Sequence, residues 1–506
     1  MLARVHAGCL VGIEARPVDV EVHIGKGLPG FDIVGLPEAA VRESRVRVRA
    51  AIANSGFELP ARHVVLNLAP ADLRKRGSSF DVAIAIAVLA ASGACAPNKL
   101  DSTLALGELS LDGSLRPVRG LLPQLKSARE RGIERAIVPG SQAADAALVE
   151  GIDVHGAQTL GEVVAFLEGE LALDRTIAPR AKSRRRRSHL DMMDVRGQGA
   201  ARRALEIAAA GKHSILFVGP PGAGKTMLAR RLPGIMPPPT SDERVEMATI
   251  HSAGGFAPLD PDERPFRAPH HTASTIALIG GGDPIRPGEV TLAHGGVLFL
   301  DELPEFQRAA VESLRVTMES GVACIARASE RATMPASPLI VAAMNPCPCG
   351  HAGDPRRCIC PPSRIDAYLG RISGPILDRF DLQVALPPVR ITELRETVAG
   401  ESSAAVRERV VRARARMDAA DPAGELGRPA RLATDLEALE RPARELLELA
   451  GDKLGLSMRG FARALRVAST IAHMDGSDAV RAAHVAEALA YRLDPRRVSG
   501  GRLGAA

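Results

Sequence analysis

The chain has 506 residues, 46% of them hydrophobic, and a formal net charge of +6. This length predicts roughly three domains, and the modest positive charge is compatible with a nucleic-acid partner without indicating one. No apolar run approaches the roughly 18 residues of a membrane span, and no apolar core follows Arg4 as it would in a signal peptide, so we expect a cytoplasmic protein without a membrane segment.

The first part of the chain, residues 1–175, predicts a compact α/β domain. Short apolar runs such as Val64–Leu68 and Ala136–Val138 alternate there with helical patterns. The following run Arg180–Ser188 holds six basic residues and no acidic residue. Such a stretch cannot pack into a core, so residues 176–190 predict a linker that is either a solvated tether or a direct contact to DNA.

A phosphate-binding loop comes next, with the sequence Gly219-Pro220-Pro221-Gly222-Ala223-Gly224-Lys225-Thr226. The apolar run Ser214–Val218 before it and the helical pattern Met227–Leu232 after it supply the strand–loop–helix context of a P-loop. The glycines let backbone N–H groups converge on phosphate oxygens, Lys225 would reach the β- and γ-phosphates, and the Thr226 hydroxyl would ligate Mg²⁺. The sequence therefore predicts a nucleoside triphosphate site.

Two later apolar runs end in polar residues suited to hydrolysis. Val297–Leu300 precedes Asp301 and Glu302, of which the first would hold Mg²⁺ and the second would polarise the attacking water. Leu339–Met344 ends at Asn345, which is placed to orient that water or to sense the γ-phosphate. Together with the P-loop, these residues predict an ATPase that uses ATP and Mg²⁺, rather than strands that end by chance in solvated turns.

Four of the seven cysteines are crowded into two close pairs separated by eight residues: Cys347 and Cys349, then Cys358 and Cys360. Four thiolates fit a tetrahedral structural zinc, with His351 as a substitute ligand, although the spacing within each pair is tighter than usual. The alternative is reduced free thiols in a loop. A metal site directly after Asn345 would support the segment that leads to Arg379.

The remainder, residues 386–506, is helical in pattern and predicts a lid. One helix carries apolar residues at a spacing of 3.6: Phe461, Ala464, Leu465, Ala468, Ile471 and Ala472. Arg459 begins this helix and could reach the phosphates of the nucleotide, while Arg463 and Arg466 equally fit a solvated basic face. Arg379, between two acids, either forms an ion pair or, in a ring ATPase, is offered to the γ-phosphate of the neighbouring subunit.

These motifs together resemble the AAA+ ATPases of the magnesium-chelatase-like branch. Four further segments narrow the resemblance to the YifB/ComM family, over essentially the whole chain: Arg264–His271, Gly288–His294, Asn345–Gly350 and Arg371–Pro375. The resemblance implies a P-loop AAA+ α/β core over residues 191–385, a C-terminal helical lid and a ring, expected to be a hexamer. For ComM-like members it implies an ATP-driven DNA helicase that promotes branch migration when transforming DNA is integrated by homologous recombination.

The first domain resembles the Lon-protease-like α/β fold of ChlI-type proteins. In Lys75–Asp81, Ser79 falls at the position of the Lon nucleophile, and Gly107–Gly113 matches a later Lon segment. The position of the Lon catalytic lysine is occupied by Leu122, so the serine lacks the base of a Ser–Lys dyad. Lys126, one helical turn further on, is not expected to replace it. We therefore expect Ser79 to be a structural turn residue and the domain to have no peptidase activity.

If a ring encircles DNA, its contacts should come from loops that face the pore. The long, Gly- and Pro-rich stretch 264–289 and a predicted hairpin over Val322–Arg331 are the candidates. Their basic and imidazole side chains are His270, His271, Arg286, Arg327 and Arg331. Such loops would grip the phosphate backbone without reading sequence, so the expected partner is branched or single-stranded DNA.

Other classes of function share the same phosphate chemistry. One is a chelatase-like subunit that drives metal insertion into a porphyrin by remodelling its partners, and another is a protein remodeller whose first domain binds a partner. The ATPase residues do not separate these from a helicase. The Lon-like first domain and the basic linker favour the helicase, and Leu122 disfavours an ATP-dependent protease.

Overall fold

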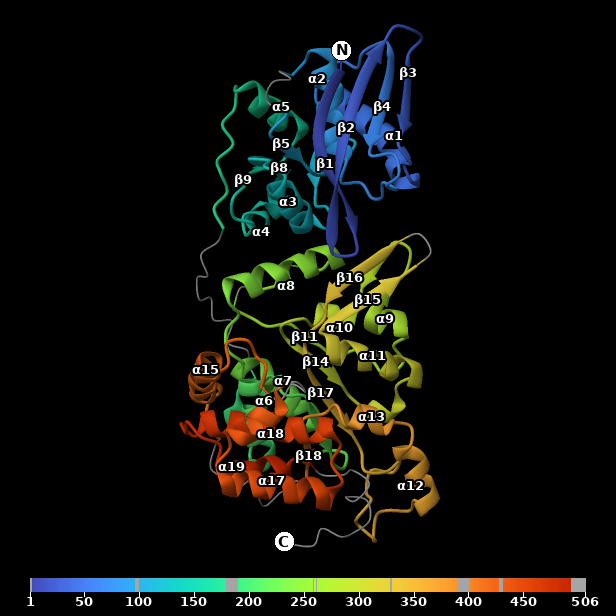
Figure 1. Ribbon diagram of the computed structural model, residues 1–506. Coiled ribbons are helices and arrows are strands. Elements are labelled where there is room, and N and C mark those ends of the chain that lie inside the picture. The colour runs from blue at the N-terminus through green and yellow to red at the C-terminus, as the bar shows by residue number, and fades with distance from the viewer. Residues whose placement is uncertain are drawn as a thin grey trace.

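The computed structural model describes residues 2–95, 100–178, 190–257, 259–260, 262–327, 330–388, 400–426 and 431–492. The first α/β domain stands at one end of an elongated molecule, and the second sheet with the C-terminal helices forms the other end (Figure 1). The predicted basic run Arg180–Ser188 lies outside the described residues. Within the described ranges, no helix is both long enough and apolar enough to cross a bilayer.

The first domain is a seven-stranded mixed sheet in the order β3-β4-β2-β1-β5-β8-β9. Its strands are β1 (Leu2–Val11), β2 (Glu14–Gly25), β3 (Gly30–Val34), β4 (His63–Ala69), β5 (Thr103–Ala105), β8 (Arg135–Pro139) and β9 (Asp153–Ala157), with a small separate hairpin of β6 (Glu108–Leu109) and β7 (Leu115–Arg116). Its helices are α1 (Ala39–Asn54), α2 (Asp81–Ser92), α3 (Leu121–Glu130), α4 (Ala143–Ala146) and α5 (Leu160–Glu168).

The Ala-rich run Val82–Ala91 forms most of α2, and every residue of this run is buried. It packs in one hydrophobic cluster with side chains of β1, β2 and β4. Small side chains let the helix axis lie close to the sheet, which explains why this stretch is apolar all round without being a membrane segment.

The second sheet is parallel, with five strands in the order β11-β14-β17-β10-β18. These are β10 (Ile215–Val218), β11 (Phe266–Arg267), β14 (Val297–Leu300), β17 (Leu339–Met344) and β18 (Leu382–Ala385). All residues of β10, β14 and β17 are buried. A parallel sheet covered on both faces requires such continuous apolar runs, which is why these strands could be predicted from the sequence.

The two faces of this sheet are covered by different helices. Ile215 and Phe217 pack in a cluster with α6 (Gly199–Gly211), α7 (Lys225–Ile235) and the C-terminal helices. Leu216 and Val218 pack on the opposite side with α11 (Arg308–Ser320) and α13 (Gly374–Leu377). Because successive side chains of β10 point to opposite faces of the sheet, this strand packs against the helices on both sides.

The C-terminal helices are α15 (Ser403–Ala420), α16 (Leu432–Glu437), α17 (Arg441–Leu454), α18 (Met458–Met474) and α19 (Ala482–Ala490). The predicted apolar face of α18 is confirmed, since Ala464, Leu465, Ala468 and Ile471 are buried in the same cluster as Phe217. The Ser457 hydroxyl caps the helix by accepting from the Gly460 N–H at 3.1 Å.

Several elements are inserted around the parallel sheet. These are α8 (Ser241–Gly254), α9 (Thr275–Ile279), β12 (Gly280–Gly281), β13 (Arg286–Pro287), α10 (Glu289–Leu292) and α12 (Pro362–Leu369), with short 3₁₀ turns at Gly140–Gln142, Met192–Asp194 and Leu303–Glu305. The predicted hairpin near residues 322–331 is confirmed as β15 (Val322–Ala326) paired with β16 (Arg331–Pro335).

The first domain rests on α8 and on the β15–β16 hairpin (Figure 1). At α8, the backbone N–H of Gly120 donates to the Ser252 carbonyl at 2.9 Å, and that of Leu122 donates to the Ser252 hydroxyl at 3.3 Å. At the hairpin, the Arg76 guanidinium lies 3.5 Å from Glu330. The same guanidinium lies 2.6 Å from Asp283. Leu122, at the position that the resemblance assigns to the Lon catalytic lysine, is therefore part of a domain contact.

A histidine lies under α18 where it crosses the parallel sheet. The ring of His213 is fully buried beside Thr470, with Nε2 2.8 Å from the threonine hydroxyl. Burial lowers the pKa of His213 to about 4, although the charge of Asp381 opposes this shift. The folded protein therefore keeps this histidine neutral at pH values where an unfolded chain protonates it.

We expect His213 to make the protein less stable as the pH falls. Between pH 7.5 and pH 5 the unfolded chain binds a proton that the folded chain does not, so the free energy of unfolding should drop by roughly 2 kcal/mol from this group. Urea unfolding of His213→Gln at the two pH values should show a shallower dependence than the wild type. The exposed His23→Gln variant is the control, and an unchanged slope in His213→Gln would contradict the assignment.

Candidate active site

The predicted phosphate loop lies between β10 and α7, and Lys225 is the first residue of that helix. Gly222 and Gly224 have φ values of +78° and +88°. A left-handed backbone conformation costs glycine little free energy, whereas a side chain makes it strained. The two glycines therefore allow the loop to turn tightly after the strand. The loop therefore ends at a helix N-terminus, where unpaired backbone N–H groups favour an anion.

Lys225 is held at the centre of this loop by three oxygen atoms. Its Nζ donates to the carbonyls of Gly219 at 2.6 Å and Pro220 at 3.0 Å, and to Asn345 Oδ1 at 2.9 Å. Burial lowers its pKa, while the nearby charges of Asp301 and Glu302 oppose the shift. The structure thus joins the P-loop to the end of β17.

The proposed magnesium ligands also meet. The Thr226 hydroxyl donates to Asp301 Oδ2 at 2.9 Å, and the other carboxylate oxygen accepts from the Glu302 N–H at 3.0 Å. Because β10, β17 and β14 are adjacent and parallel, their carboxyl ends lie at one edge of the sheet. A hydroxyl and a carboxylate at this edge are the oxygen ligands that Mg²⁺ takes in P-loop ATPases.

Glu302 lies close to a residue whose contact with it the sequence did not reveal. Its carboxylate lies 3.3 Å from Nδ1 of His271, and its backbone is left-handed, with φ +54°. The sequence predicted His270 and His271 only as members of a DNA-contacting loop. The position of the two histidines shortly after β11 could have indicated this contact. Strand β11 pairs in parallel with β14, so the residues that follow the two strands reach the same edge of the sheet.

Arg379 and Arg459, the two arginines predicted to act on nucleotide phosphates, both pair with Glu319 and not with a residue of the P-loop. The buried guanidinium of Arg379 bonds Glu319 and the Pro375 carbonyl, and its Nε has no hydrogen-bond partner. Arg459 is largely exposed and lies 3.5 Å from the same Glu319. Among the described residues, Arg459 therefore pairs with Glu319 rather than with a group of the P-loop.

The alternatives predicted for Arg463 need correction. Its side chain is only 12% exposed and lies 3.0 Å from Asp381, while Arg466 lies 3.7 Å from the same carboxylate. The reason is that α18 crosses the start of β18, so the basic side of the helix faces Asp381. Arg379 is flanked by acids in sequence, yet its ion partner is the distant Glu319.

The four clustered cysteines converge. Their sulfur atoms all lie within 4.8 Å of one another, with Cys347 3.3 Å from Cys349 and 3.9 Å from Cys358. A tetrahedral zinc with Zn–S bonds of about 2.3 Å requires sulfurs about 3.8 Å apart, so the arrangement fits this ion. Within the described residues, this group consists of the cysteines and does not include His351.

The cysteine loop packs directly on the phosphate loop. Gly350, between the cysteine pairs, has a φ of +83°, and a Cβ at this position would lie 2.8 Å from Cγ of Pro221 and still closer to its Cδ. Since Pro221 belongs to the predicted phosphate loop, the cysteine loop contacts the nucleotide site through Gly350 and, two residues before Cys347, through Asn345.

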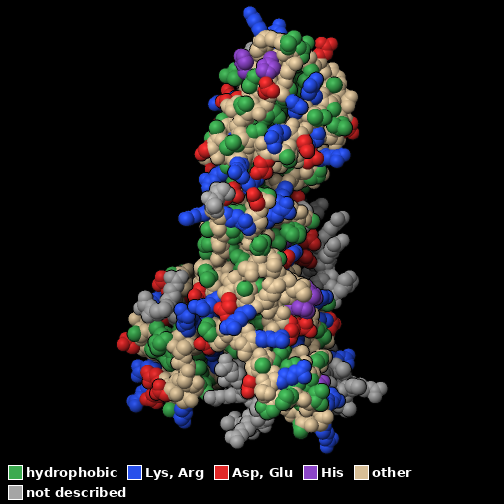
Figure 2. All heavy atoms as spheres, turned by 90° about the vertical axis from the view of Figure 1, so that its right-hand side faces the viewer, with side chains coloured by type: hydrophobic (Ala, Val, Ile, Leu, Met, Phe, Trp, Pro, Cys, Tyr) green, Lys and Arg blue, Asp and Glu red, His purple; other side chains and the backbone are tan. Residues whose placement is uncertain are grey.

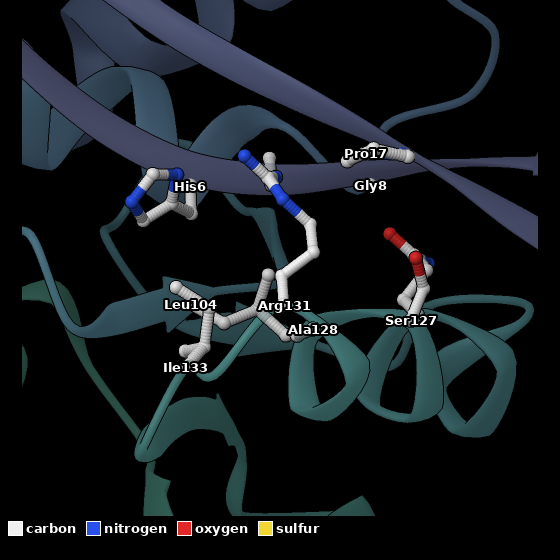
Figure 3. Close-up of a pocket in the computed structure, with 10 residues that line it drawn as sticks. His6, Gly8, Pro17, Leu104, Ser127, Ala128, Arg131 and Ile133 are labelled. Atoms are coloured by element: carbon white, nitrogen blue, oxygen red, sulfur yellow. The ribbon is translucent and has the colours of Figure 1, made fainter.

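A cavity in the first domain lies apart from this site, between the β1–β2 strands and α3 (Figure 3). Figure 3 shows Arg131, at the end of α3, extending toward the strand that carries His6. Asp19 lies 2.8 Å from His6 and 3.7 Å from Arg131. The charges at this cavity therefore neutralise one another, so the cavity offers little to a charged ligand.

Three family profiles match the chain in succession. Residues 20–142 match subunit ChlI of Mg-chelatase, residues 191–394 match magnesium chelatase subunit ChlI, and residues 400–492 match the C-terminal part of that subunit. An uncharacterised YifB protein of Escherichia coli is 44% identical, and competence protein ComM of Haemophilus influenzae is 43% identical. The alignments cover 98% of both chains for the first relative and 97% of both chains for the second.

The chain belongs to the YifB/ComM family of magnesium-chelatase-like AAA+ proteins. A short match of 67 residues, 34% identical, to Lon protease 2 of Bacillus subtilis covers 13% of the chain. Within the resembling segment, Ser79 is buried and its carbonyl accepts from the Gly107 N–H at 3.2 Å. Leu122 is buried in α3, and Lys126 is exposed on the same helix.

We expect Gly350→Ala to weaken ATP binding about tenfold, because the added Cβ pushes against Pro221 and overpacking costs roughly 1–3 kcal/mol. Titration with a fluorescent ATP analogue measures the effect. Gly353→Ala is a matched control, since Gly353 lies in the same loop at φ +93° but its Cβ would meet nothing within 4 Å. Equal nucleotide affinity in the two variants would show that the contact with Pro221 does not matter.

Proposed function

We propose that this protein is an ATPase that works as a ring-forming DNA motor, a helicase that drives branch migration during homologous recombination of transforming DNA. The observation that carries the ATPase assignment is the meeting of Lys225 with Asn345 and of Thr226 with Asp301 at one edge of the parallel sheet. The DNA assignment is supported by the name of the competence relative and by exposed arginines at the domain junction.

In the proposed reaction, the backbone N–H groups of the P-loop bind the phosphates, and Lys225 leaves its carbonyl partners to neutralise the β- and γ-phosphates. Thr226 and Asp301 would hold Mg²⁺, whose charge would stabilise the developing negative charge on the phosphates. The Glu302 carboxylate takes a proton from a water whose oxygen attacks the γ-phosphorus, and the bond to the bridging oxygen of ADP breaks. Asn345, already bonded to Lys225, senses the γ-phosphate and orients the water.

A ring, proposed to be a hexamer, would complete the site. Arg379 and Arg459 share Glu319 outside the P-loop group, and the Arg379 Nε lacks an acceptor. The proposed role of Arg379 is to reach the γ-phosphate of a neighbouring subunit, where its charge stabilises the transition state. Arg459, exposed at the start of α18, is proposed to act on nucleotide phosphates in the same assembly.

DNA would be held through its backbone. Arg286, Arg327 and Arg331 are exposed on the two short hairpins, and Figure 2 shows Lys and Arg side chains gathered at the waist between the first domain and the rest of the molecule. Such a surface fits phosphates without reading bases. We place this activity in the cytoplasm, where unpaired thiols are kept reduced.

The cysteine cluster is proposed to hold one structural zinc ion. Four sulfurs at tetrahedral spacing would close the loop that carries Gly350 and keep it against Pro221. The ion would take no part in the chemical step. Its proposed effect is to fix the position of the segment between Asn345 and Arg379.

The first test is ATP hydrolysis with and without a forked or three-stranded DNA. We expect DNA to stimulate the rate, Glu302→Gln to lower it by at least about a hundredfold, and Lys225→Ala to abolish ATP binding. The stimulation should weaken as salt rises, since phosphate contacts release counterions. Robust hydrolysis that ignores DNA would favour the alternative, a chelatase-like or protein-remodelling ATPase without DNA translocation.

Purified protein should contain about one zinc per chain by elemental analysis. Cys358→Ser should lose the metal, and it should bind ATP more weakly because the loop against Pro221 loses its crosslink. Cys324→Ser is the control, since Cys324 is an exposed cysteine outside the cluster. Metal-free wild-type protein with unchanged ATP affinity would contradict the proposed support of the nucleotide site.

A further inference from the structure

Helix α1 of the first domain presents a row of arginines to solvent. Arg42, Arg45 and Arg49 are exposed, and their spacing of three and four residues places them on one face of the helix. The other face packs into the domain core through buried residues such as Val41 and Val48. The helix therefore has an apolar face that the fold requires and a basic face that it does not.

The positive charge of this row is not neutralised within the domain. A fourth arginine of the helix, Arg47, turns inward, where its Nε donates to the buried Asp81 at 2.7 Å. Glu43 is the one acidic residue of α1, and it lies 3.9 Å from Arg47. Among the described residues, no ion pair joins an acid to the three exposed arginines. Because like charges three and four residues apart destabilise a helix, the bare row is better explained by an anionic partner than by helix stability.

The row begins at the contact between the first domain and the β15–β16 hairpin. Glu38 precedes α1, and its carboxylate lies 2.6 Å from Arg76, whose guanidinium also lies 3.5 Å from Glu330 of the hairpin. The backbone N–H of Arg42 donates to the Glu38 carbonyl at 3.0 Å, so the first arginine of the row is one helical turn from this contact. In Figure 1, α1 and the hairpin lie on the same side of the molecule.

Basic side chains continue from α1 onto the hairpin. Arg327 and Arg331, one on each strand near the tip, are exposed. Figure 2 views the molecule from the side on which α1 lies in Figure 1, and Lys and Arg side chains are spread over the first domain there as well as at the waist. A basic surface that extends over two domains fits a long polyanion better than a small one.

The chemistry of the row fits the backbone of duplex DNA. An α-helix rises about 1.5 Å per residue, so the row spans roughly 10 Å. B-DNA carries one phosphate charge per about 1.7 Å of its axis, so a duplex offers several phosphates over this length. Proteins that bind single strands also stack the bases on aromatic side chains. Among the described residues, the one exposed Phe or Tyr is Phe256, which follows α8 and does not belong to the first domain.

We propose that α1 of the first domain binds the phosphate backbone of duplex DNA through Arg42, Arg45 and Arg49. This inference rests on the proposed DNA motor and gives its first domain a task, which is to guide a duplex arm of the branched substrate toward the hairpins. The contact reads no bases, because contacts between arginine and phosphate carry no sequence information.

The test is binding of a fluorescently labelled blunt duplex to the full-length protein, measured by anisotropy over a series of salt concentrations. Each phosphate contact contributes about 0.9 to the slope of log affinity against log salt. Replacing Arg42, Arg45 and Arg49 by Gln together should therefore flatten the slope by about 2.7 and weaken binding about tenfold near physiological salt. An unchanged slope and affinity would overturn the proposal.

Helix α15 offers a matched control. Arg412 and Arg416 are exposed there and four residues apart, as Arg45 and Arg49 are on α1. Figure 1 shows α15 on the opposite side of the molecule from α1. Arg45→Gln with Arg49→Gln should flatten the slope by about 1.8, whereas Arg412→Gln with Arg416→Gln removes the same charge and should leave the slope unchanged. Equal losses in the two double variants would refute a specific contact at α1.

Stability and a conservative replacement separate binding from folding. Because the three side chains are exposed and repel one another, the Gln variants should melt at the same temperature as the wild type or slightly higher. Lys at all three positions keeps the charge and should keep most of the slope. Loss of DNA affinity together with a marked fall in melting temperature, or equal losses in the Lys and Gln variants, would count against the phosphate contact.

The outcomes also separate this inference from the proposed function. If the triple Gln variant loses duplex affinity but DNA does not stimulate ATP hydrolysis by the wild type, the contact at α1 stands and the motor fails. If DNA stimulates hydrolysis by both proteins equally and their duplex affinities agree, the motor stands and the contact fails. An equal loss of affinity for a single-stranded oligonucleotide would refute the assignment to duplex DNA.

Discussion

The structure depends on one constraint, the alignment of three buried parallel strands whose carboxyl ends reach a common edge. Backbone hydrogen bonds fix Phe217 of β10 opposite Ala343 of β17, and Phe299 of β14 opposite Val341. A slip in either register would move Lys225 away from Asn345 or Thr226 away from Asp301. Because both faces of the sheet are buried, such a slip would also expose apolar side chains, so packing and chemistry enforce the same register.

A second feature is common to the whole site. Each charged or polar group assigned to the reaction already has a protein partner: Lys225 has loop carbonyls and Asn345, Thr226 has Asp301, Glu302 has His271, and Arg379 has Glu319. Buried or half-buried charges require such partners when no ligand is present. In the proposed reaction, Mg²⁺ and nucleotide would replace these protein contacts.

Several segments connect the site to the rest of the molecule. The cysteine loop contacts Pro221, and the helix α18 pairs with Asp381 beside Arg379. The segment between β11 and α10, which carries His271, reaches Arg76 of the first domain through Asp283. The first domain uses the surface around Leu122 to dock on α8.

The sequence by itself determined the phosphate loop, the buried strands and the polar residues at their ends, because these features are local. Four continuous apolar residues before Asp301 and a glycine-rich turn before Lys225 have few structural alternatives. It also predicted the apolar face of α18 and a hairpin over residues 322–331, whose second strand extends to Pro335 in the structure. The close spacing of the four cysteines in the sequence likewise predicted that their sulfur atoms lie together.

Only the tertiary structure decided which distant groups meet. Four contacts join segments separated by many residues: Arg379 with Glu319, Arg463 with Asp381, Gly350 with Pro221, and Glu302 with His271. No local pattern encodes such pairs, because they depend on how the strands are ordered and how helices cross them. The sequence predicts which residues form the proposed catalytic group, whereas the packing of the sheet sets their partners.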